Sequence, residues 1–488
     1  MILTVDLGTS ATKVAVWGEH GLVALGRAPV ASQILPGRRV EQDPGSWWAS
    51  VVAATRQLGA GAPAALDGVE AVGFSAARQT LVPVAPDGTP LGTALVWSDR
   101  RAGAEAAALA AACGGAEAAH RRTGLVLDAA APAAKLAWLA AHEPDRLRRA
   151  RWILSPRDLV VLHLTGEARS DPTLASASGL YDTGASPMVD PDPELAGAGA
   201  GLLPEIVPSA TVVGGLRPGP GADLGLAPGI PVVVGAGDRA CEVLGTGARP
   251  DLPMVSWGTT ANVSVPVGAR PDPLPPAVVV TAGALGGWLL EGGLSAAGSA
   301  LSWLAGLTGH PVEDLMARAA TSPPGARGLV ALPWFGGARA PWWRDGARGA
   351  LVGLDLEHDA GDVARALMEA VAVDLCRCLA AAGVGVGTGP GRWGATGVVL
   401  GGGGSTDPAW LEVLTGVTGL GATRRRSGEA ASAGAARVTA AALGRDLDLD
   451  LVDPVVEEVT PRPELVAAYR AGRGVADAAA GAVMGLTP

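Results

Sequence analysis

The stretch TVDLGTSATKVAV, from Thr4 to Val16, recurs half a chain later as MVSWGTTANVSV, from Met254 to Val265. Each copy is a short apolar segment, a turn of glycine and threonine, and a second apolar segment, which is the pattern of two strands joined by a tight hairpin. The equivalent glycines, Gly8 and Gly258, are about half of the 488-residue chain apart. Because repetition at such a distance indicates duplication, the sequence predicts two related halves.

A second pair of segments has the same character. VVVGAGD at Val232–Asp238 and VVLGGGG at Val398–Gly404 are both apolar strands that run into a glycine turn. The alternative is chance similarity between glycine-rich hairpins, and the half-chain spacing of the first pair favours duplication. We therefore interpret these two segments as equivalent strands of the two halves.

The length of the chain predicts more than one domain, because a single hydrophobic core stops growing at about 250–300 residues. We expect a boundary near Ala248–Pro253, giving domains 1–248 and 249–488. Strands alternate with helices, which predicts α/β domains. In one predicted helix, Asp362–Ala382, Asp362 is the expected cap. Apolar residues recur every four positions on the core face of this helix, namely Leu367, Val371, Leu375 and Leu379.

Composition and charge exclude several classes of protein. The chain is 17% charged with a formal net charge of −10, so we expect no nucleic-acid partner. The one basic run, Arg424–Arg426, is interpreted as a solvated loop. No apolar run has membrane-spanning length and no signal-peptide pattern opens the chain, so we expect a cytoplasmic protein without a membrane partner. The cysteines lack metal-binding spacing and are interpreted as reduced thiols: Cys113, Cys241, Cys376 and Cys378.

The two hairpin turns have the chemistry of phosphate-binding sites. Backbone N–H groups and hydroxyls gather in a small concavity at Gly8-Thr9-Ser10 and again at Gly258-Thr259-Thr260. One such nest in each half could hold one polyphosphate from both sides. Asp6, just before the first nest, is a candidate ligand for Mg²⁺, directly or through water. Lys13 is either a phosphate contact or a lysine at the strand edge, and we favour the second slightly.

Two further glycine turns suggest a nucleoside site and a reacting group. The run Gly401–Gly404, followed by Ser405, would let a flat nucleoside approach the backbone closely. Asp238 follows the strand Val232–Val234 and a turn of small residues. It is either the N-cap of the following helix or the carboxylate that accepts a hydroxyl proton during phosphoryl transfer.

Several longer motifs resemble the FGGY family of carbohydrate kinases, most closely its xylulose kinase and glycerol kinase branches. The similarity runs nearly end to end, and it is the joint order of the motifs that is specific. The motifs are DLGTS at Asp6–Ser10, EQDPGSWW at Glu41–Trp48, WSDRR at Trp97–Arg101, PAAKLAWL at Pro132–Leu139, GALVGLDLEHDAGDVARALME at Gly349–Glu369, GGGGSTDPAW at Gly401–Trp410 and EAASAGAA at Glu429–Ala436.

The resemblance implies an α/β fold of two actin-like (ribonuclease H-like) domains with an interdomain cleft. It implies ATP and Mg²⁺ as cofactors, Asp238 as general base, Asp6 as metal ligand and Trp303 near the nucleotide. The expected reaction is phosphorylation of a hydroxyl of a small sugar or polyol, with a pentulose first. The oligomeric state is left open between monomer and homodimer. The nucleotide-binding residues that the family implies are Gly8, Thr9, Ser10, Lys13, Gly258, Thr259, Thr260, Gly298, Ser302, Gly402, Gly403, Gly404 and Asp407.

The expected sugar site departs from both branches. Arg78 and Gln79 resemble the glycerol kinase pattern more than the xylulose kinase pattern, and Arg239 stands where the branches have an amide. A guanidinium offers five donors and no acceptor, so the substrate cannot be copied from either branch. Two guanidiniums without a carboxylate neighbour would suit a sugar acid, although we keep a neutral pentulose or polyol ahead.

Another departure and two rival functions remain. The family's acidic motif is replaced by Gly337–Pro341, inside a tryptophan-rich segment, Trp334–Trp343, whose role the sequence does not assign. The alternatives to a pentulose kinase are a kinase of the glycerol, erythritol or gluconate type and a non-catalytic nucleotide-binding regulator. An actin-like ATPase that only moves domains would not explain the motif at Glu41–Trp48.

Overall fold

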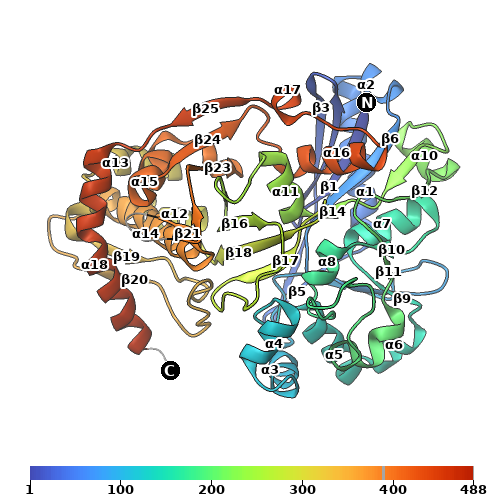
Figure 1. The fold of residues 1–488 in the computed structure, drawn as a ribbon, viewed down its shortest axis with the longest axis horizontal. Coiled ribbons are helices and arrows are strands. Elements are labelled where there is room, and N and C mark those ends of the chain that lie inside the picture. Colours follow the sequence, from blue (N-terminus) through green and yellow to red (C-terminus); the bar gives the residue numbers. More distant parts are fainter. Residues whose placement is uncertain (387–390, 487–488) are drawn as a thin grey trace.

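The computed structural model describes residues 1–386 and 391–486, and its two halves are each built on a seven-stranded sheet (Figure 1). The first sheet has the order β12-β13-β6-β1-β2-β3, with β14 beside β6, and the second has the order β17-β18-β16-β15-β23-β24-β25. The strands of the first sheet are β1 (Ile2–Leu7), β2 (Ala11–Gly18), β3 (Gly21–Pro29), β6 (Ala71–Ala76), β12 (Val212–Gly215), β13 (Pro231–Val233) and β14 (Ala236–Gly237). Those of the second are β15 (Met254–Trp257), β16 (Ala261–Val267), β17 (Val279–Ala282), β18 (Trp288–Leu294), β23 (Gly397–Gly401), β24 (Gly421–Arg425) and β25 (Val455–Val459).

The pairing of the strands confirms the first predicted repeat and corrects the second. Strands β1 and β2 form an antiparallel hairpin with β6 parallel to β1, and β15 and β16 form a hairpin with β23 parallel to β15. The equivalent of β23 is therefore β6. The segment Val232–Asp238 contains β13, which lies beyond β6 and corresponds to β24. The predicted equivalence of Val232–Asp238 and Val398–Gly404 was wrong, because a glycine turn can follow any strand whose end another backbone approaches.

The helix α16 (Ala430–Ala442) links the C-terminal part of the chain to the first sheet. It packs against β1, β6 and α11 (Asp238–Thr246), and Figure 1 shows it in red beside α11 and the blue strands. Glycines allow the two helices to touch. A Cβ atom at Gly245 would lie 1.8 Å from the carbonyl oxygen of Ala430, and one at Gly434 would lie 1.8 Å from that of Cys241. The boundary at 248/249 stays a prediction, and the connection between the sheets runs through residues 247–253.

The long helix α14 (Ala360–Ala381) lies in the core of the second half. Its predicted core face is confirmed, since all four apolar residues expected there are buried. The expected cap was wrong. Asp359 is the N-cap, and Asp362 occupies the third helical position, where the two carboxylates complete a capping box. The other long helices are α1 (Gly45–Gly61), α3 (Gly103–Ala112), α5 (Pro132–His142), α7 (Pro156–Thr165), α12 (Gly298–Thr308), α13 (Val312–Thr321), α15 (Pro408–Thr418) and α18 (Pro463–Gly485).

Shorter elements fill the connections. The short helices are α2 (Ala64–Asp67), α4 (Ala116–Thr123), α6 (Pro144–Arg149), α8 (Pro172–Ser176), α9 (Pro193–Ala196), α10 (Pro218–Leu224) and α17 (Leu449–Val452), with 3-10 turns at Gly197–Leu202, Ala326–Gly328 and Gly403–Thr406. The short strands are β4 (Gln33–Leu35), β5 (Arg39–Gln42), β7 (Val82–Val84), β8 (Ala94–Leu95), β9 (Trp152–Leu154), β10 (Arg169–Ser170), β11 (Glu205–Ile206), β19 (Val330–Leu332), β20 (Ala350–Val352), β21 (Val384–Gly385) and β22 (Trp393–Gly394).

Three expectations from composition can be compared with the structure. The basic run is not a solvated loop, because Arg424 pairs with Glu457 across β24 and β25, and Arg425 donates to the carbonyl of Thr246. All four cysteines are free thiols, and three of them are buried. In the described part of the chain, no helix has both the length and the apolar character needed to cross a bilayer.

Candidate active site

A cavity of about 270 Å³ lies between the two halves. The first half contributes Thr9, Arg78 and Asp238 to its walls, and the second half contributes Thr260 and Glu291. Strands β16 and β18 of the second half therefore face α11 of the first across this cavity. The structure thus brings the predicted general base, the predicted sugar-site residues and both predicted nests to one cleft.

The turn before Asp238 is held rigidly from behind. Gly235 has a φ of +75°, and a Cβ atom there would lie 2.1 Å from the carbonyl oxygen of Phe74. The buried Arg157 donates to the carbonyl of Gly235 at 3.0 Å, and the amide of Gly237 donates to the hydroxyl of Thr173 at 2.7 Å. These contacts place the following residue at the cleft without using its side chain.

Asp238 is free to face the cavity. The helix α11 begins at Asp238 with Gly237 as its N-cap, and no side chain caps it. The capping alternative for Asp238 was therefore wrong. Its carboxylate accepts a hydrogen bond from the adjacent amide of Arg239 at 2.7 Å, and 38% of the side chain is exposed.

The missing side chain of Gly237 makes room for another side chain of the protein. A Cβ atom at Gly237 would lie 2.9 Å from the Cγ and Cδ atoms of Arg78. The Arg78 side chain thus crosses the turn on its way into the cavity. Its guanidinium donates to Glu291 at 2.8 and 2.6 Å and lies 3.5 Å from Asp238.

The expectation of two unneutralised guanidiniums was wrong. Arg78 pairs with Glu291, and Arg239 pairs with Glu242 and lies 3.9 Å from Glu291. Burial raises the pKa of the Glu291 carboxyl, but the attraction of Arg78 outweighs it and leaves this pKa below its ordinary value. Sequence reasoning missed the pair because Arg78 and Glu291 are 213 positions apart.

Asp6 is the penultimate residue of β1 and is partly buried near one lysine and two other carboxylates. It accepts a hydrogen bond from the Ser75 hydroxyl at 2.9 Å. Burial raises the pKa of Asp6 to about 6, Lys13 opposes the rise, and the charges of Asp238 and Glu429 add to it. A cation is the natural complement of such a carboxylate, so the residues fit Mg²⁺. Among the described residues, no group of three or more His, Cys, Asp or Glu could hold a metal, so most ligands of this ion would be water and phosphate.

The family motifs support the first nest. The side chain of Gln42 donates to the carbonyl of Thr9 at 2.7 Å, and the indole of Trp97 donates to the Thr9 hydroxyl at 2.8 Å. Trp47 donates to Gln42 in turn, at 2.9 Å. Lys13 pairs with Glu429 at 2.7 Å, which gives this lysine a partner within the protein. The motifs at Glu41–Trp48 and Trp97–Arg101 therefore position the nest.

A buried lysine supports the sugar-site loop. Lys135 donates to the carbonyl of Gln79 at 2.8 Å and to that of Val96 at 2.7 Å. Burial lowers the pKa of Lys135 to about 7, with Asp99 and Asp128 opposing the fall. Gln79 itself has a φ of +60°, a conformation that this support stabilises.

The predicted nucleotide residues gather around the second nest. The amide of Gly298, at the start of α12, donates to the carbonyl of Gly258 at 2.9 Å, and the hydroxyl of Ser302 donates to that of Gly298 at 3.2 Å. The glycine turn approaches from the other side, since a Cβ atom at Gly402 would lie 2.4 Å from the carbonyl oxygen of Trp257. A Cβ atom at Gly404 would lie 2.0 Å from the Trp257 indole, so only glycines, which have no side chain, fit in this turn.

Two predicted nucleotide residues have other surroundings. Asp407 is the N-cap of α15, and its carboxylate accepts from the amides of Ala409 and Trp410 at 3.0 and 3.1 Å. Its side chain is therefore engaged within the protein. Trp303 is 41% exposed and packs on Phe335, with ring centroids 4.7 Å apart.

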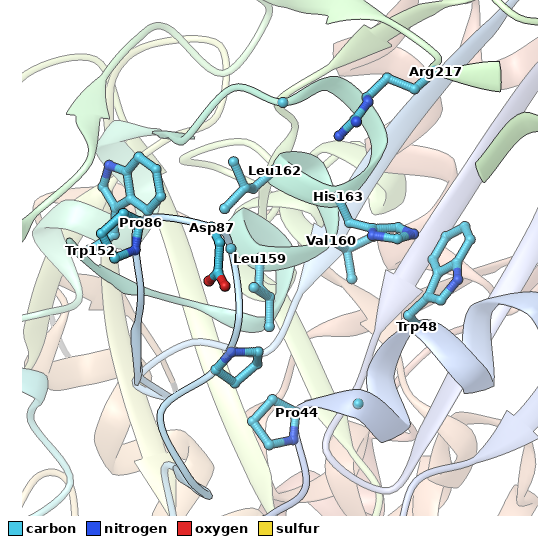
Figure 2. A pocket seen from close by; sticks show the side chains of 14 residues that line it. Pro44, Trp48, Pro86, Asp87, Trp152, Leu159, Val160, Leu162, His163 and Arg217 are labelled. Carbon is cyan, nitrogen blue, oxygen red and sulfur yellow. The ribbon is translucent and has the colours of Figure 1, made fainter. Parts of the chain in front are cut away.

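Another cavity, of about 370 Å³, lies within the first half, away from these residues. Figure 2 shows the rings of Trp48 and His163 together on one side of it and Trp152 on the other. Its one carboxylate, Asp87, is exposed, and none of the predicted site residues lines it. The candidate active site is therefore the smaller cavity that holds Asp238.

Comparisons with known proteins agree with this geometry. Residues 1–245 match the N-terminal domain of the FGGY family of carbohydrate kinases, and residues 254–443 match its C-terminal domain. A xylulose kinase of Streptomyces rubiginosus is 30% identical over 91% of this chain and 88% of its own, and a glycerol kinase of Trichlorobacter lovleyi is 30% identical over 91% and 90%. The crystal structure of a xylulose kinase from Rhodospirillum rubrum, 27% identical, superposes with a TM-score of 0.85 over 99% of both chains. The expected actin-like α/β fold is thus confirmed.

Proposed function

The chain belongs to the FGGY family of carbohydrate kinases, which are ATP-dependent enzymes, and from this premise we propose that it phosphorylates a hydroxyl of a pentulose such as xylulose. Asp238 is the proposed general base. The observation that carries the proposal is its uncapped, partly exposed carboxylate in a cavity lined by both halves. The similarity to xylulose kinases supports a pentulose over glycerol or a sugar acid as the first substrate to test.

In the proposed reaction, Asp238 accepts the proton of the attacking hydroxyl. Phosphoryl transfer needs positioning and charge neutralisation more than covalent help, so one carboxylate at the hydroxyl is sufficient. The ion pair of Arg78 with Glu291 places donors beside Asp238 without adding net charge. The attacking oxygen is therefore oriented by neutralised groups while its proton leaves.

The two nests are the proposed binding sites of the ATP phosphates. Thr9 and Thr259 come from opposite halves, so one triphosphate would be held from both sides. Mg²⁺ would be held near Asp6 and would neutralise charge on the phosphates. We propose that residues 1–248 and 249–488 close on the substrates and exclude water from the cleft. Small-angle scattering with sugar and a non-hydrolysable ATP analogue should give a smaller radius of gyration, and the same data report whether the protein is a monomer or a homodimer.

A coupled assay of ADP release tests the proposed reaction. The panel is xylulose, ribulose, glycerol, erythritol, xylitol and gluconate, with purified protein, ATP and Mg²⁺. We expect the highest kcat/KM with a pentulose. ATP binding by calorimetry without ADP release on any substrate would instead support the regulator. We further propose a cytoplasmic enzyme whose partners are these small molecules, with neither nucleic acid nor a membrane among them.

A further inference from the structure

Two polar side chains in the cleft have no partner. The Nε atom of Arg339 and the Oδ1 atom of Asn262 are shielded from solvent, and neither makes a hydrogen bond within the described chain. Both residues line the cavity that holds Asp238. The Arg339 guanidinium lies over the ring of Trp343, with the ring centroid 6.0 Å from Cζ. Unpaired buried polar groups are destabilising, so a pair of them in a ligand cavity indicates a ligand.

The two side chains share one part of the cavity wall. Asn262 on β16 lies directly opposite Gly293 on β18. A Cβ atom at Gly293 would lie 3.6 Å from Nη1 of Arg339, so the guanidinium covers the space that a side chain would fill. Directly opposed residues point to the same face of a sheet, about 5 Å apart. The amide of Asn262 and the guanidinium of Arg339 are therefore neighbours over the same strand pair.

This pair lies two strand residues from the carboxylate that holds Arg78 beside the general base. Glu291, which holds Arg78 beside Asp238, is two residues from Gly293 on the same strand and the same face. Two residues of a strand span roughly 7 Å. An open-chain sugar of five or six carbons is therefore long enough to contact both the Arg78–Glu291 pair and the Arg339–Asn262 pair.

Arg339 also differs from the other cavity arginines because no nearby carboxylate compensates its charge. Glu291 neutralises Arg78 and Glu242 neutralises Arg239, but no carboxylate of the described chain lies within 4 Å of Arg339. Burial lowers the pKa of the Arg339 guanidinium, while the more distant Asp128 and Asp345 raise it only in part. A substrate oxygen that carries negative charge, or a carbonyl oxygen, would complete this site.

We propose that Arg339 and Asn262 form a specificity subsite for an α-hydroxycarbonyl group of the substrate. The guanidinium has donors only and takes the carbonyl or carboxylate oxygen, whereas the amide oxygen takes the proton of the adjacent hydroxyl. A ketose presents this group as a ketone beside a hydroxymethyl, and a sugar acid presents it as a carboxylate beside a hydroxyl. A polyol has no such group. The inference rests on the proposed function, since it concerns the same substrate.

Kinetics on three matched five-carbon compounds test the subsite. Xylulose carries the ketone, xylonate the carboxylate, and xylitol neither. In Arg339→Gln we expect kcat/KM to fall about 10- to 100-fold on whichever of xylulose and xylonate the wild type prefers, mainly through KM, because a hydrogen bond to a charged group is lost. Activity on xylitol should change less than about threefold. Arg344→Gln is the matched control, since it removes an exposed charge from the same segment.

Two further variants test the same subsite. Asn262→Ala should weaken the same substrates and spare xylitol, and Arg339→Lys should retain part of the affinity for xylonate. A wild-type preference for xylonate identifies a carboxylate as the ligand, and a preference for xylulose identifies a ketone. Equal loss on all three compounds, loss on none, or a wild type that prefers xylitol would overturn the proposal.

Calorimetry separates this inference from the proposed reaction. If no compound is phosphorylated but xylulose or xylonate binds, and Arg339→Gln weakens that binding, the kinase proposal fails and the subsite stands. If compounds are phosphorylated but the variants do not discriminate among them, the kinase stands and the subsite fails. If neither xylulose nor xylonate binds to the wild type, the subsite is also overturned.

Discussion

The two hairpins that open the two sheets have the same pairing and different chemistry. β1 and β2 surround the nest at Thr9, and β15 and β16 surround the nest at Thr259, each with a parallel strand on the far side. The first hairpin carries Asp6 before its turn, whereas the equivalent residue of the second is Ser256. The next residue of the second hairpin, Trp257, packs against glycines.

The two nests share a backbone geometry but differ in the side chains beside them. A carboxylate lies beside the first nest, so this nest can serve a metal ion, whereas its lysine is paired with Glu429. The second hairpin contains no carboxylate, and its nest is surrounded by neutral backbone and an indole, so it can hold phosphate without supplying a metal ligand. The sheet geometry is shared because it is set by strand pairing, while the chemistry depends on single side chains at the turn.

The largest expected effect is at Asp238, on the charged side of this comparison. Asp238→Asn should lower kcat by about 10²–10⁴, the usual size of a general-base contribution, while ATP and sugar affinities change only a few-fold. Steady-state kinetics and calorimetry measure the two quantities. Asp87→Asn, in the other cavity of the same half, is the control. Near-normal turnover in Asp238→Asn would remove this residue from the mechanism.

A smaller effect is expected at Asp6, which distinguishes the first nest from the second. Asp6→Asn should lower kcat/KM by roughly 10- to 100-fold at limiting Mg²⁺, less at saturating Mg²⁺, because phosphate and water supply the other ligands. Since the pKa of Asp6 is about 6, wild-type kcat/KM at limiting Mg²⁺ should rise as the pH increases through 6. An unchanged Mg²⁺ requirement in the variant would show that the two nests do not differ in this respect.

The same pKa makes a prediction about stability. The Asp6 carboxyl binds its proton more strongly in the folded protein than at its ordinary pKa of 3.8. Its contribution to the free energy of unfolding is therefore fully present below pH 3.8 and is lost as the pH rises through about 6. Between pH 4 and pH 7, the wild type should therefore lose more of its free energy of unfolding than Asp6→Asn does, and denaturation at both pH values measures this difference.

The contact between α11 and α16 tests how far the first half depends on the C-terminal chain. Gly434→Ala should destabilise the protein by about 1–3 kcal/mol, since its Cβ would overlap the α11 backbone. Gly481→Ala in α18 is the control, because nothing lies within 4 Å of that position. Urea denaturation gives both values. Equal stability of the two variants would mean that the helix crossing relaxes without cost.

The smallest expected effect is at Arg239. Because Arg239 is neutralised by Glu242, Arg239→Gln should leave the ratio of kcat/KM between xylonate and xylulose within about threefold. A shift of tenfold or more would assign the choice of substrate to Arg239 and would weaken the case for Arg339.

Local patterns were sufficient to predict much of this molecule. The repeated hairpin, the buried face of α14 and the position of Asp238 after a strand each depend on residues close together in the chain. Glycine turns and alternating apolar residues report such local geometry directly. These patterns gave wrong predictions where several positions in the chain share them. Two examples are the predicted equivalence of β13 and β23 and the prediction of Asp362 as the N-cap of α14.

The strands, the turns and the reactive side chains are therefore encoded locally, in residues that lie close together in the chain. Only the tertiary structure decided their partners. Arg78 meets Glu291 across 213 positions and Lys13 meets Glu429 across 416, and these contacts neutralise one arginine and one lysine that looked free in sequence. Arg339 remains unpaired because the fold brings no carboxylate of the described chain within 4 Å of it. Hydrophobic burial brings distant segments together, and only then does through-space distance settle which charges are compensated.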